Sequence, residues 1–306
     1  MIIFLQATVE GLSLAAIYSL VAIGFVLIYK SMDVLSFAQP ALAVVGAGII
    51  SSLAVDRGIP FWLALILGIF LTGMLSLIIE RTFLRPMVGE PVFSVAILTI
   101  GIDILLRTVL DSWIGINPRY LGDPFPTFGN FGAVNVGGVN LKFLELSALV
   151  TAILIIVILS VFFKRSKYGV AMRATSFDQE AALAQGINVG RIFGLAWFIA
   201  GILAAFAGFF ITGGFNTLGQ FSFLIALRAL PAVVIGGLDS IPGAVIGSII
   251  IGLTQGYVGY YQIPFENLIG FSLGSGFSLL APYLIMFIIL IFKPDGLFGT
   301  EEVERV

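Results

Sequence analysis

The feature that most constrains this chain is a series of long apolar runs that recurs along its whole length. An α-helix of about 20 apolar residues can cross a hydrocarbon core of roughly 30 Å, and only 10% of the 306 residues are charged. The runs cover residues 10–29, 35–55, 61–79, 92–110, 144–163, 192–212, 222–236, 242–260 and 278–292. We therefore predict an all-α integral membrane protein, a polytopic helical bundle of about 8–9 transmembrane or re-entrant segments that forms a single domain over residues 1–306. The runs 222–236 and 278–292 are short for a full span, so 222–260 is compatible with two crossings or with a re-entrant pair.

Lys and Arg residues near the ends of these runs predict the orientation of the chain, because basic residues accumulate on the cytoplasmic side. An outside N-terminus and a cytoplasmic C-terminus place ten of them inside and three outside. The inside set is Lys30, Arg81, Arg85, Lys164, Arg165, Lys167, Arg173, Arg191, Lys293 and Arg305, and the outside set is Arg57, Arg119 and Lys142. The long loop 164–191 is then cytoplasmic, and the loop 111–143 is extracellular.

The extracellular loop contains the sequence VNVGGVNL, residues 134–141, in which apolar and polar residues alternate around Gly137 and Gly138. This pattern predicts a short β-hairpin. The hairpin would serve either as a lid or docking surface or as a simple connector.

The cytoplasmic loop contains signals for a short helix. Ser176 and Gln179 fit a capping box, and Gly186 has the position of a left-handed C-terminal cap. They predict a helix from Phe177 to Gln185. Helices shorter than about 12 residues are marginal in water, so this one needs a surface to pack against.

One face of the predicted helix is suited to docking. Phe177, Ala181 and Ala184 share it by helical spacing, and Asp178 and Glu180 in the first turn complement the helix dipole. A helix lying on lipid headgroups would have a broader face of Trp, Leu and Phe. We therefore interpret this segment as a docking element for another protein.

Several chemistries are excluded by composition. The chain has no cysteine and no histidine, which removes disulfides, thiolate metal sites and the commonest general base. It also lacks a G-x-x-x-x-G-K-[ST] loop, so ATP-driven transport would require a separate nucleotide-binding subunit. We expect no enzyme activity, no metal site, no cofactor and no nucleic-acid partner.

The sequence YGVAMRATSFDQEAALAQGINVGR, residues 168–191, resembles the cytoplasmic loop of LivH/LivM-type permeases of bacterial ABC importers. Further resemblances follow in family order, in IERTFLRPM (79–87), ILTIGIDILL (97–106), ALPAVVIGGLDSIPGAVIGSIIIGL (229–253) and KPDGLFG (293–299). In that family the cytoplasmic loop holds the coupling helix, which seats in a cleft of the ATPase. The resemblance thus implies ATPase-coupling roles for Tyr168, Gly169, Arg173, Ala174, Phe177, Asp178, Glu180, Ala181, Ala182 and Gly186.

The resemblance also implies a function and partners. The chain would be a permease subunit in the bacterial cytoplasmic (inner) membrane that imports branched-chain or other hydrophobic amino acids. Its partners would be a second permease of the same family, two ATPase subunits that bind ATP and Mg, an extracytoplasmic solute-binding protein and membrane lipid. Relatives that carry urea, amides or other small solutes leave the cargo open. A stand-alone secondary transporter is a further alternative, although the lack of histidine and of unpaired intramembrane carboxylates argues against proton coupling.

Two similar stretches, PALAVVGAG (40–48) and PAVVIGG (231–237), lie in the two halves of the chain. Such Gly/Pro-interrupted pairs indicate broken helices around a translocation path, unless the similarity is a chance result of biased composition. Pro40, where the resembled family usually has Gly, is expected to bend or break the second helix. The residues predicted to line the path are Ser36, Phe37, Gln39, Pro40, Thr99, Gly101, Gln220 and Ser222.

Small residues and charges within the apolar runs complete the pattern. The pairs Gly243/Gly247 and Gly252/Gly256 predict close helix packing, either within the bundle or against a partner permease. Asp103 and Arg107 are four residues apart. We interpret them as a structural ion pair facing the bundle interior, with a functional role as the alternative.

Overall fold

The computed structural model describes residues 1–115, 117–121, 132–213, 217–274 and 276–299. These residues are mainly helical, and seven helices are long and apolar enough to cross a membrane. They are α1 (Ile2–Met32), α2 (Gln39–Ser51) with its π-helical extension η1 (Ser52–Asp56), α3 (Phe61–Ile79) with η2 (Glu80–Leu84) and η3 (Arg85–Met87), α4 (Val92–Ile114), α5 (Phe143–Arg165), α8 (Val189–Thr212) and α11 (Ile241–Ile269). The predicted polytopic helical fold is confirmed.

Shorter elements connect these spans. The helices are α6 (Lys167–Phe177), α7 (Gln179–Ala184), α9 (Gln220–Leu227), α10 (Ala229–Gly236) and α12 (Phe277–Phe292), and the strands are β1 (Arg119–Tyr120), β2 (Ala133–Val136), β3 (Val139–Lys142) and β4 (Thr217–Leu218). β2 and β3 form the predicted hairpin around Gly137 and Gly138, both at positive φ. β1 pairs with β4, which brings the end of α4 next to the start of α9.

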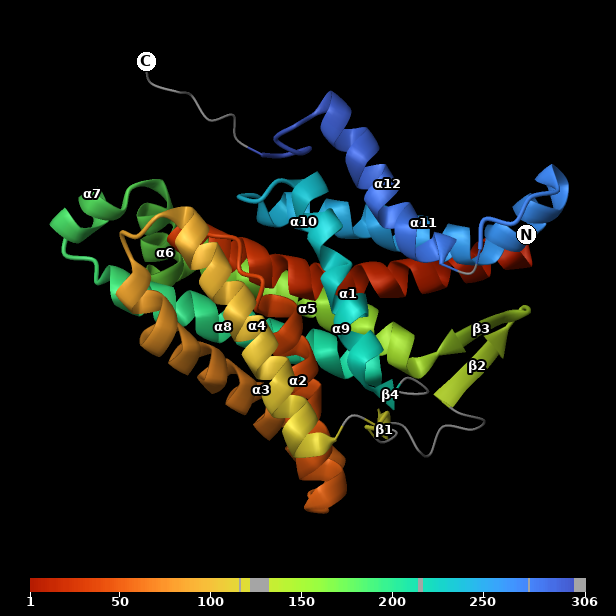
Figure 1. Ribbon diagram of the computed structural model, residues 1–306, viewed down its shortest axis with the longest axis horizontal. Coiled ribbons are helices and arrows are strands. Elements are labelled where there is room, and N and C mark those ends of the chain that lie inside the picture. The colour runs from red at the N-terminus through yellow and green to blue at the C-terminus, as the bar shows by residue number, and fades with distance from the viewer. Residues whose placement is uncertain (116, 122–131, 214–216, 275, 300–306) are drawn as a thin grey trace.

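The helix α1 forms the core of the bundle, with α11, α8, α5 and α10 packed around it (Figure 1). Its large side chains Tyr18 and Phe25 are fully buried. A Cβ on Gly252 of α11 would lie 2.5 Å from Ala15 N of α1, so the two backbones are in direct contact. Gly247 meets the backbone of α10 in the same way. These glycines therefore pack within the bundle, the first of the two predicted alternatives.

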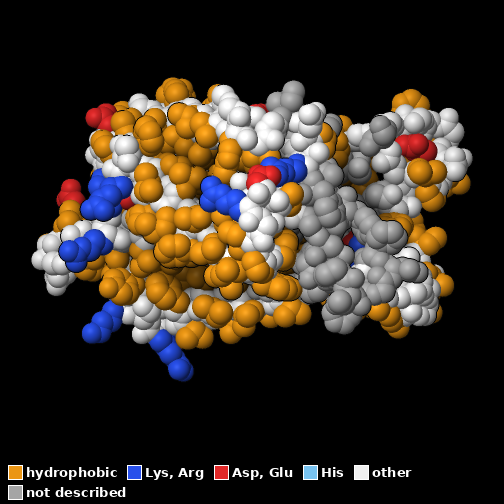
Figure 2. Space-filling model, turned by 90° about the horizontal axis from the view of Figure 1, so that it is seen from below, with side chains coloured by type: hydrophobic (Ala, Val, Ile, Leu, Met, Phe, Trp, Pro, Cys, Tyr) orange, Lys and Arg blue, Asp and Glu red, His pale blue; other side chains and the backbone are white. Residues whose placement is uncertain are grey.

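The outer helices expose their apolar side chains. Large hydrophobic residues of α3, α4, α5 and α12 lie on the surface, among them Phe70, Phe93, Ile153 and Phe287. Figure 2 shows hydrophobic side chains across the middle of one face, with basic side chains along its left-hand edge and in a group near the centre. Such a surface is expected where these helices face the lipid of a membrane.

The chain between α1 and α2 is a buried, non-helical segment. The αL residue Asp33 ends α1, and residues 34–38 run back into the protein before α2 starts at Gln39. Pro40 lies in the first turn of α2, where a missing N–H costs no helical hydrogen bond. The expectation that Pro40 bends or breaks this helix was wrong, because the helix begins there.

Residues 220–236 cross the bundle as two short helices. α9 starts beside β1, next to the end of α4. α10 ends near the last turn of α1, where Lys30 Nζ donates a 2.7 Å hydrogen bond to Asp239 O. The single residue Arg228 separates the two helices. α9 and α10 therefore form a broken pair of short helices that leads from β4 to the neighbourhood of the last turn of α1 (Figure 1).

Candidate functional site

A buried polar cluster lies where α2 begins. Ser36 and Gln39 are fully buried, and Gln39 Nε2 donates a 3.0 Å hydrogen bond to Ala200 O of α8. Among the described residues, Ser36 Oγ and Gln39 Oε1 have no hydrogen-bond partner. A Cβ on Gly24 of α1 would overlap the Gln39 amide, so glycine at this position leaves room for the amide in its present place. Buried polar atoms without partners are costly, which makes this cluster a candidate for contact with a transported solute.

The cluster extends to α4 through the backbone of Phe37. Phe37 N donates to Thr99 Oγ1 at 3.1 Å, and the Thr99 hydroxyl donates to Ala96 O at 2.8 Å. Thr99 is fully buried. The structure thus brings Ser36, Phe37, Gln39 and Thr99 together, from two helices and the segment that precedes α2.

The other predicted path residues are more scattered. Pro40 is buried beside Gln39, and Ser222 is buried in α9, where Gly219 N donates to its hydroxyl. Gly101 is exposed on α4, with no atom within 4 Å of its added Cβ, and it does not share this cluster. Gln220 begins α9, but its side chain lies outside the described residues.

A cavity of about 350 Å³ opens between α2, α4 and α9. Arg107 lines it and binds Asp103 Oδ2 through Nη2 at 2.6 Å. The Arg107 guanidinium also lies 4.2 Å from the centre of the Phe223 ring on α9. The predicted Asp103–Arg107 pair is therefore confirmed, and Arg107 faces a cavity as well as the bundle.

The segment 167–188 is a helical hairpin that projects from one end of the bundle (Figure 1). The predicted helix Phe177–Gln185 with a Ser176 cap was wrong in its start. α6 continues to Phe177, and α7 begins at Gln179 with Asp178 as its N-cap, whose Oδ1 accepts a 2.8 Å hydrogen bond from Ala181 N. Packing of Gly169, Met172 and Thr175 on the bundle extends α6 past the predicted cap.

The end of α7 follows the prediction. Gly186 has φ of +79°, and its N–H donates to Leu183 O at 2.9 Å. Ile187 N donates to Ala182 O at 3.0 Å, which completes a Schellman motif. A short helix is thus capped at both ends by its own sequence.

The hairpin divides into a surface that faces outward and residues that hold it in place. Phe177 is 94% exposed and Leu183 is 57% exposed. The outward set also contains Tyr168, Arg173, Asp178, Glu180, Ala181, Ala184 and Gly186. Ala182 is instead buried against Val189 and Phe193 of α8, Ala174 is half-buried, and a Cβ on Gly169 would overlap the α5 backbone. The three residues predicted to share one face lie on two helices, and all three are exposed.

One buried ion pair below this hairpin was not predicted from the sequence. Glu80 is fully buried, and its two carboxylate oxygens accept hydrogen bonds from Arg85 at 3.0 and 2.9 Å. Arg85 Nη2 also donates to Gly190 O, at 2.6 Å, in the first turn of α8. The pair therefore ties the end of α3 to the residues that follow α7.

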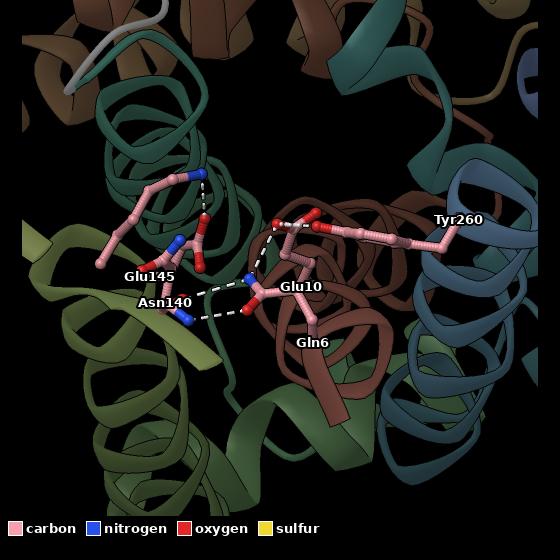
Figure 3. A network of polar contacts seen from close by, with 6 residues as sticks. Gln6, Glu10, Asn140, Glu145 and Tyr260 are labelled. Atoms are coloured by element: carbon pink, nitrogen blue, oxygen red, sulfur yellow. Dashed lines mark hydrogen bonds and ion pairs between the residues drawn. The ribbon is translucent and has the colours of Figure 1, made fainter. Parts of the chain in front are cut away.

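At the other end of the bundle, a polar network fixes the β2–β3 hairpin to α1 (Figure 3). Gln6 donates to Asn140 O at 3.1 Å and accepts from Asn140 N at 2.8 Å. Tyr260 of α11 donates to Glu10 at 2.6 Å, and Lys142 donates to Glu145 at 2.7 Å. Burial alone would lower the pKa of Lys142, but its hydrogen bond to Glu145 and the negative charges of Glu145 and Glu10 together outweigh burial and raise this pKa.

Sequence comparison adds to this geometry. The family described as "Branched-chain amino acid transport system / permease component" matches residues 7–292. The chain belongs to this family. It is similar to the high-affinity branched-chain amino acid transport system permease protein BraD of Pseudomonas aeruginosa, with 26% identity over 99% of this chain and 98% of that protein. The corresponding LivH protein of Escherichia coli strain K12 is 25% identical over the same shares, and a probable LivH of Methanocaldococcus jannaschii is 27% identical over 94% and 91%. No solved structure matches the chain at a significant level.

Family membership and the seven apolar helices make this chain a multi-pass membrane permease component. Within the described ranges, no three side chains of the His, Cys, Asp or Glu type lie close enough to hold a metal ion.

Proposed function

We propose that this chain is the transmembrane permease subunit of a bacterial ABC importer for branched-chain or other hydrophobic amino acids. The observation that carries this proposal is the projecting α6–α7 hairpin, within a chain that belongs to a permease family over residues 7–292. Its exposed Phe177 and Leu183 present apolar area in a polar segment, and such a surface is suited to a groove on another protein. The ATPase subunit is the partner that ATP-driven import requires, and α7 is the coupling helix.

The subunit works with partners in the bacterial cytoplasmic membrane. A second permease of the same family completes the membrane part, two ATPases bind ATP and Mg on the cytoplasmic side, and a solute-binding protein delivers the amino acid outside. The N-terminus is outside and the C-terminus inside, as the distribution of Lys and Arg indicates. This chain binds no cofactor and has no catalytic residue of its own.

The solute passes between the broken helices. The path includes Ser36, Phe37 and Gln39 at the start of α2, Thr99 of α4 and Ser222 in α9. At the start of α2, Ser36 Oγ and Gln39 Oε1 have no hydrogen-bond partner within the part of the chain that the structure describes. In alternating access the ATPase dimer closes on ATP, α7 moves with it, and the start of α8 and the end of α3 follow through Arg85. The bundle then exposes the path to the opposite side.

The test is uptake of labelled leucine by the reconstituted complex, together with ATP hydrolysis stimulated by the loaded binding protein. Ala181→Trp and Gly186→Val should lower uptake and stimulated hydrolysis while membrane insertion is retained. Gly58→Val is the matched control, since Gly58 also has positive φ and open surroundings but lies in the loop before α3. Normal stimulated hydrolysis in the α7 variants would refute the coupling role. Solute flux through this chain alone would instead favour a secondary transporter. Uptake of urea or amides, with no uptake of leucine, would identify those small solutes as the substrate instead of amino acids.

A further inference from the structure

The cavity between α2, α4 and α9 lies along the helices that carry the buried polar cluster. Val44 lines it, five residues beyond Gln39 on α2, and Arg107 lines it, eight residues beyond Thr99 on α4. At 1.5 Å per helical residue these separations are about 8 Å and about 12 Å. The cavity is therefore one to two helical turns from the cluster, on the side where α4 ends and α9 begins.

Charges of both signs line this cavity. Arg107 has five N–H donors, of which Nη2 binds Asp103, while its buried Nε has no partner among the described residues. Asp111 is one turn further along α4 and also lines the cavity. Its carboxylate forms no hydrogen bond or ion pair with any described residue. Arg119, by contrast, is paired with Asp56.

Apart from Asn117 and the glycines Gly115 and Gly219, the remaining wall of the cavity is apolar. The apolar residues are Val44, Leu110, Ile114, Leu218, Phe223 and Leu224. The Phe223 ring holds the Arg107 guanidinium in place by a cation–π contact. The volume of the cavity lies at the lower end of the roughly 300–1,000 Å³ range of small-molecule sites. The cavity therefore suits a small solute with one aliphatic group and two opposite charges.

We infer that this cavity is a binding site for the zwitterion of an aliphatic α-amino acid on its way to the buried cluster. The carboxylate binds Arg107, the ammonium group binds Asp111, and the side chain packs on Val44, Leu110 and Phe223. This inference rests on the proposed function, and it names the residues that recognise the backbone charges of the solute.

The test measures weak binding directly, without the solute-binding protein. The assembled permease–ATPase complex in nanodiscs is titrated with leucine, 4-methylpentanoate (no ammonium group) and isopentylamine (no carboxylate), and affinity is measured by saturation-transfer difference NMR. The wild-type complex should bind leucine at least tenfold more tightly than either analogue. Arg107→Gln should weaken the binding of leucine at least tenfold, because the leucine carboxylate loses its partner. Leucine should then bind no more tightly than isopentylamine. In Asp111→Asn, leucine should bind no more tightly than 4-methylpentanoate.

Controls separate binding from folding. Arg107→Gln leaves Asp103 without its partner, so the double variant Asp103→Asn/Arg107→Gln, which retains no lone charge, should show the same loss of leucine binding. Arg57→Gln makes the same charge change at an exposed position outside the cavity and should bind leucine as the wild type does.

Two outcomes would overturn the inference while the proposed function stands. The first is a complex that imports leucine while Arg107→Gln and Asp111→Asn bind leucine with wild-type affinity. The second is loss of the second permease from the complex in both variants, which would assign this face to a subunit contact. A wild-type complex that imports no amino acid would refute the proposed function itself.

Discussion

Removal of the Arg85 side chain should destabilise the protein strongly, because it leaves the carboxylate of Glu80 buried without a counter-charge. Both Glu80 oxygens accept from Arg85, and the Glu80 side chain is fully buried. Breaking a buried pair from one side costs about 3–5 kcal/mol. Arg85 is 34% exposed, so water can partly solvate the site, and we expect the Arg85→Gln loss at the lower end, about 3 kcal/mol.

The assay is thermal unfolding of the purified complex, followed by intrinsic fluorescence. At about 2 °C per kcal/mol for a large domain, Arg85→Gln should lower Tm by about 6 °C. Arg81→Gln is the matched control, because Arg81 is exposed in the same π-helical turn, and it should change Tm by no more than about 1 °C. The double variant Glu80→Met/Arg85→Met removes both charges together and should recover most of the lost stability. Equal Tm values for Arg85→Gln and Arg81→Gln would refute the reasoning.

Three further predictions concern helix packing, capping and the hairpin. Gly252→Ala should lower the stability of the protein by about 1–3 kcal/mol, because the added methyl group overlaps α1. Gly259→Ala, at an open position of the same helix, should raise the stability by up to about 1 kcal/mol in the same unfolding assay. Equal effects of the two variants would contradict the packing. Asp178→Ala should destabilise α7 by about 1 kcal/mol, measured as faster amide exchange in α7, and Ser176→Ala should leave this exchange unchanged. Faster exchange in Ser176→Ala than in Asp178→Ala would identify Ser176 as the N-cap instead. Gln6→Ala should raise amide exchange in β3 about tenfold because two hydrogen bonds to Asn140 are lost, and unchanged exchange would show that the hairpin is held by other contacts.

Local patterns were sufficient for the parts of the fold that depend on local physics. Apolar runs locate every long helix, because a lipid-facing or buried helix needs continuous apolar sequence. Gly137 and Gly138 predict the hairpin turn and Gly186 predicts the end of α7, because each position requires a positive φ.

The errors arose where tertiary packing decides between local signals. Ser176 and Asp178 are both good N-caps, and α6 continues past Ser176 because its inner face packs on the bundle. The Glu80–Arg85 pair has a spacing of five, which α-helical rules do not bring together. The π-helical turn, with its hydrogen bond from Arg85 N to Glu80 O, aligns them. The cavity joins Val44, Arg107 and Phe223 from three distant segments, so no sequence window contains it.

Contacts between helix backbones at glycine divide this bundle into two blocks. Gly252 and Gly247 lock α11 to α1 and α10, and Gly208 of α8 lies directly on the Ala43 backbone of α2. Such contacts have no side chains that could rotate to allow sliding, so each block moves as one piece. Where the two blocks meet, Gly24 of α1 lies against the flexible amide of Gln39 instead of against a helix backbone, and Gln39 Oε1 has no hydrogen-bond partner among the described residues. For the proposed import cycle, this arrangement predicts that the two blocks move relative to one another at the Gly24–Gln39 contact, where a side chain can adjust and a backbone cannot.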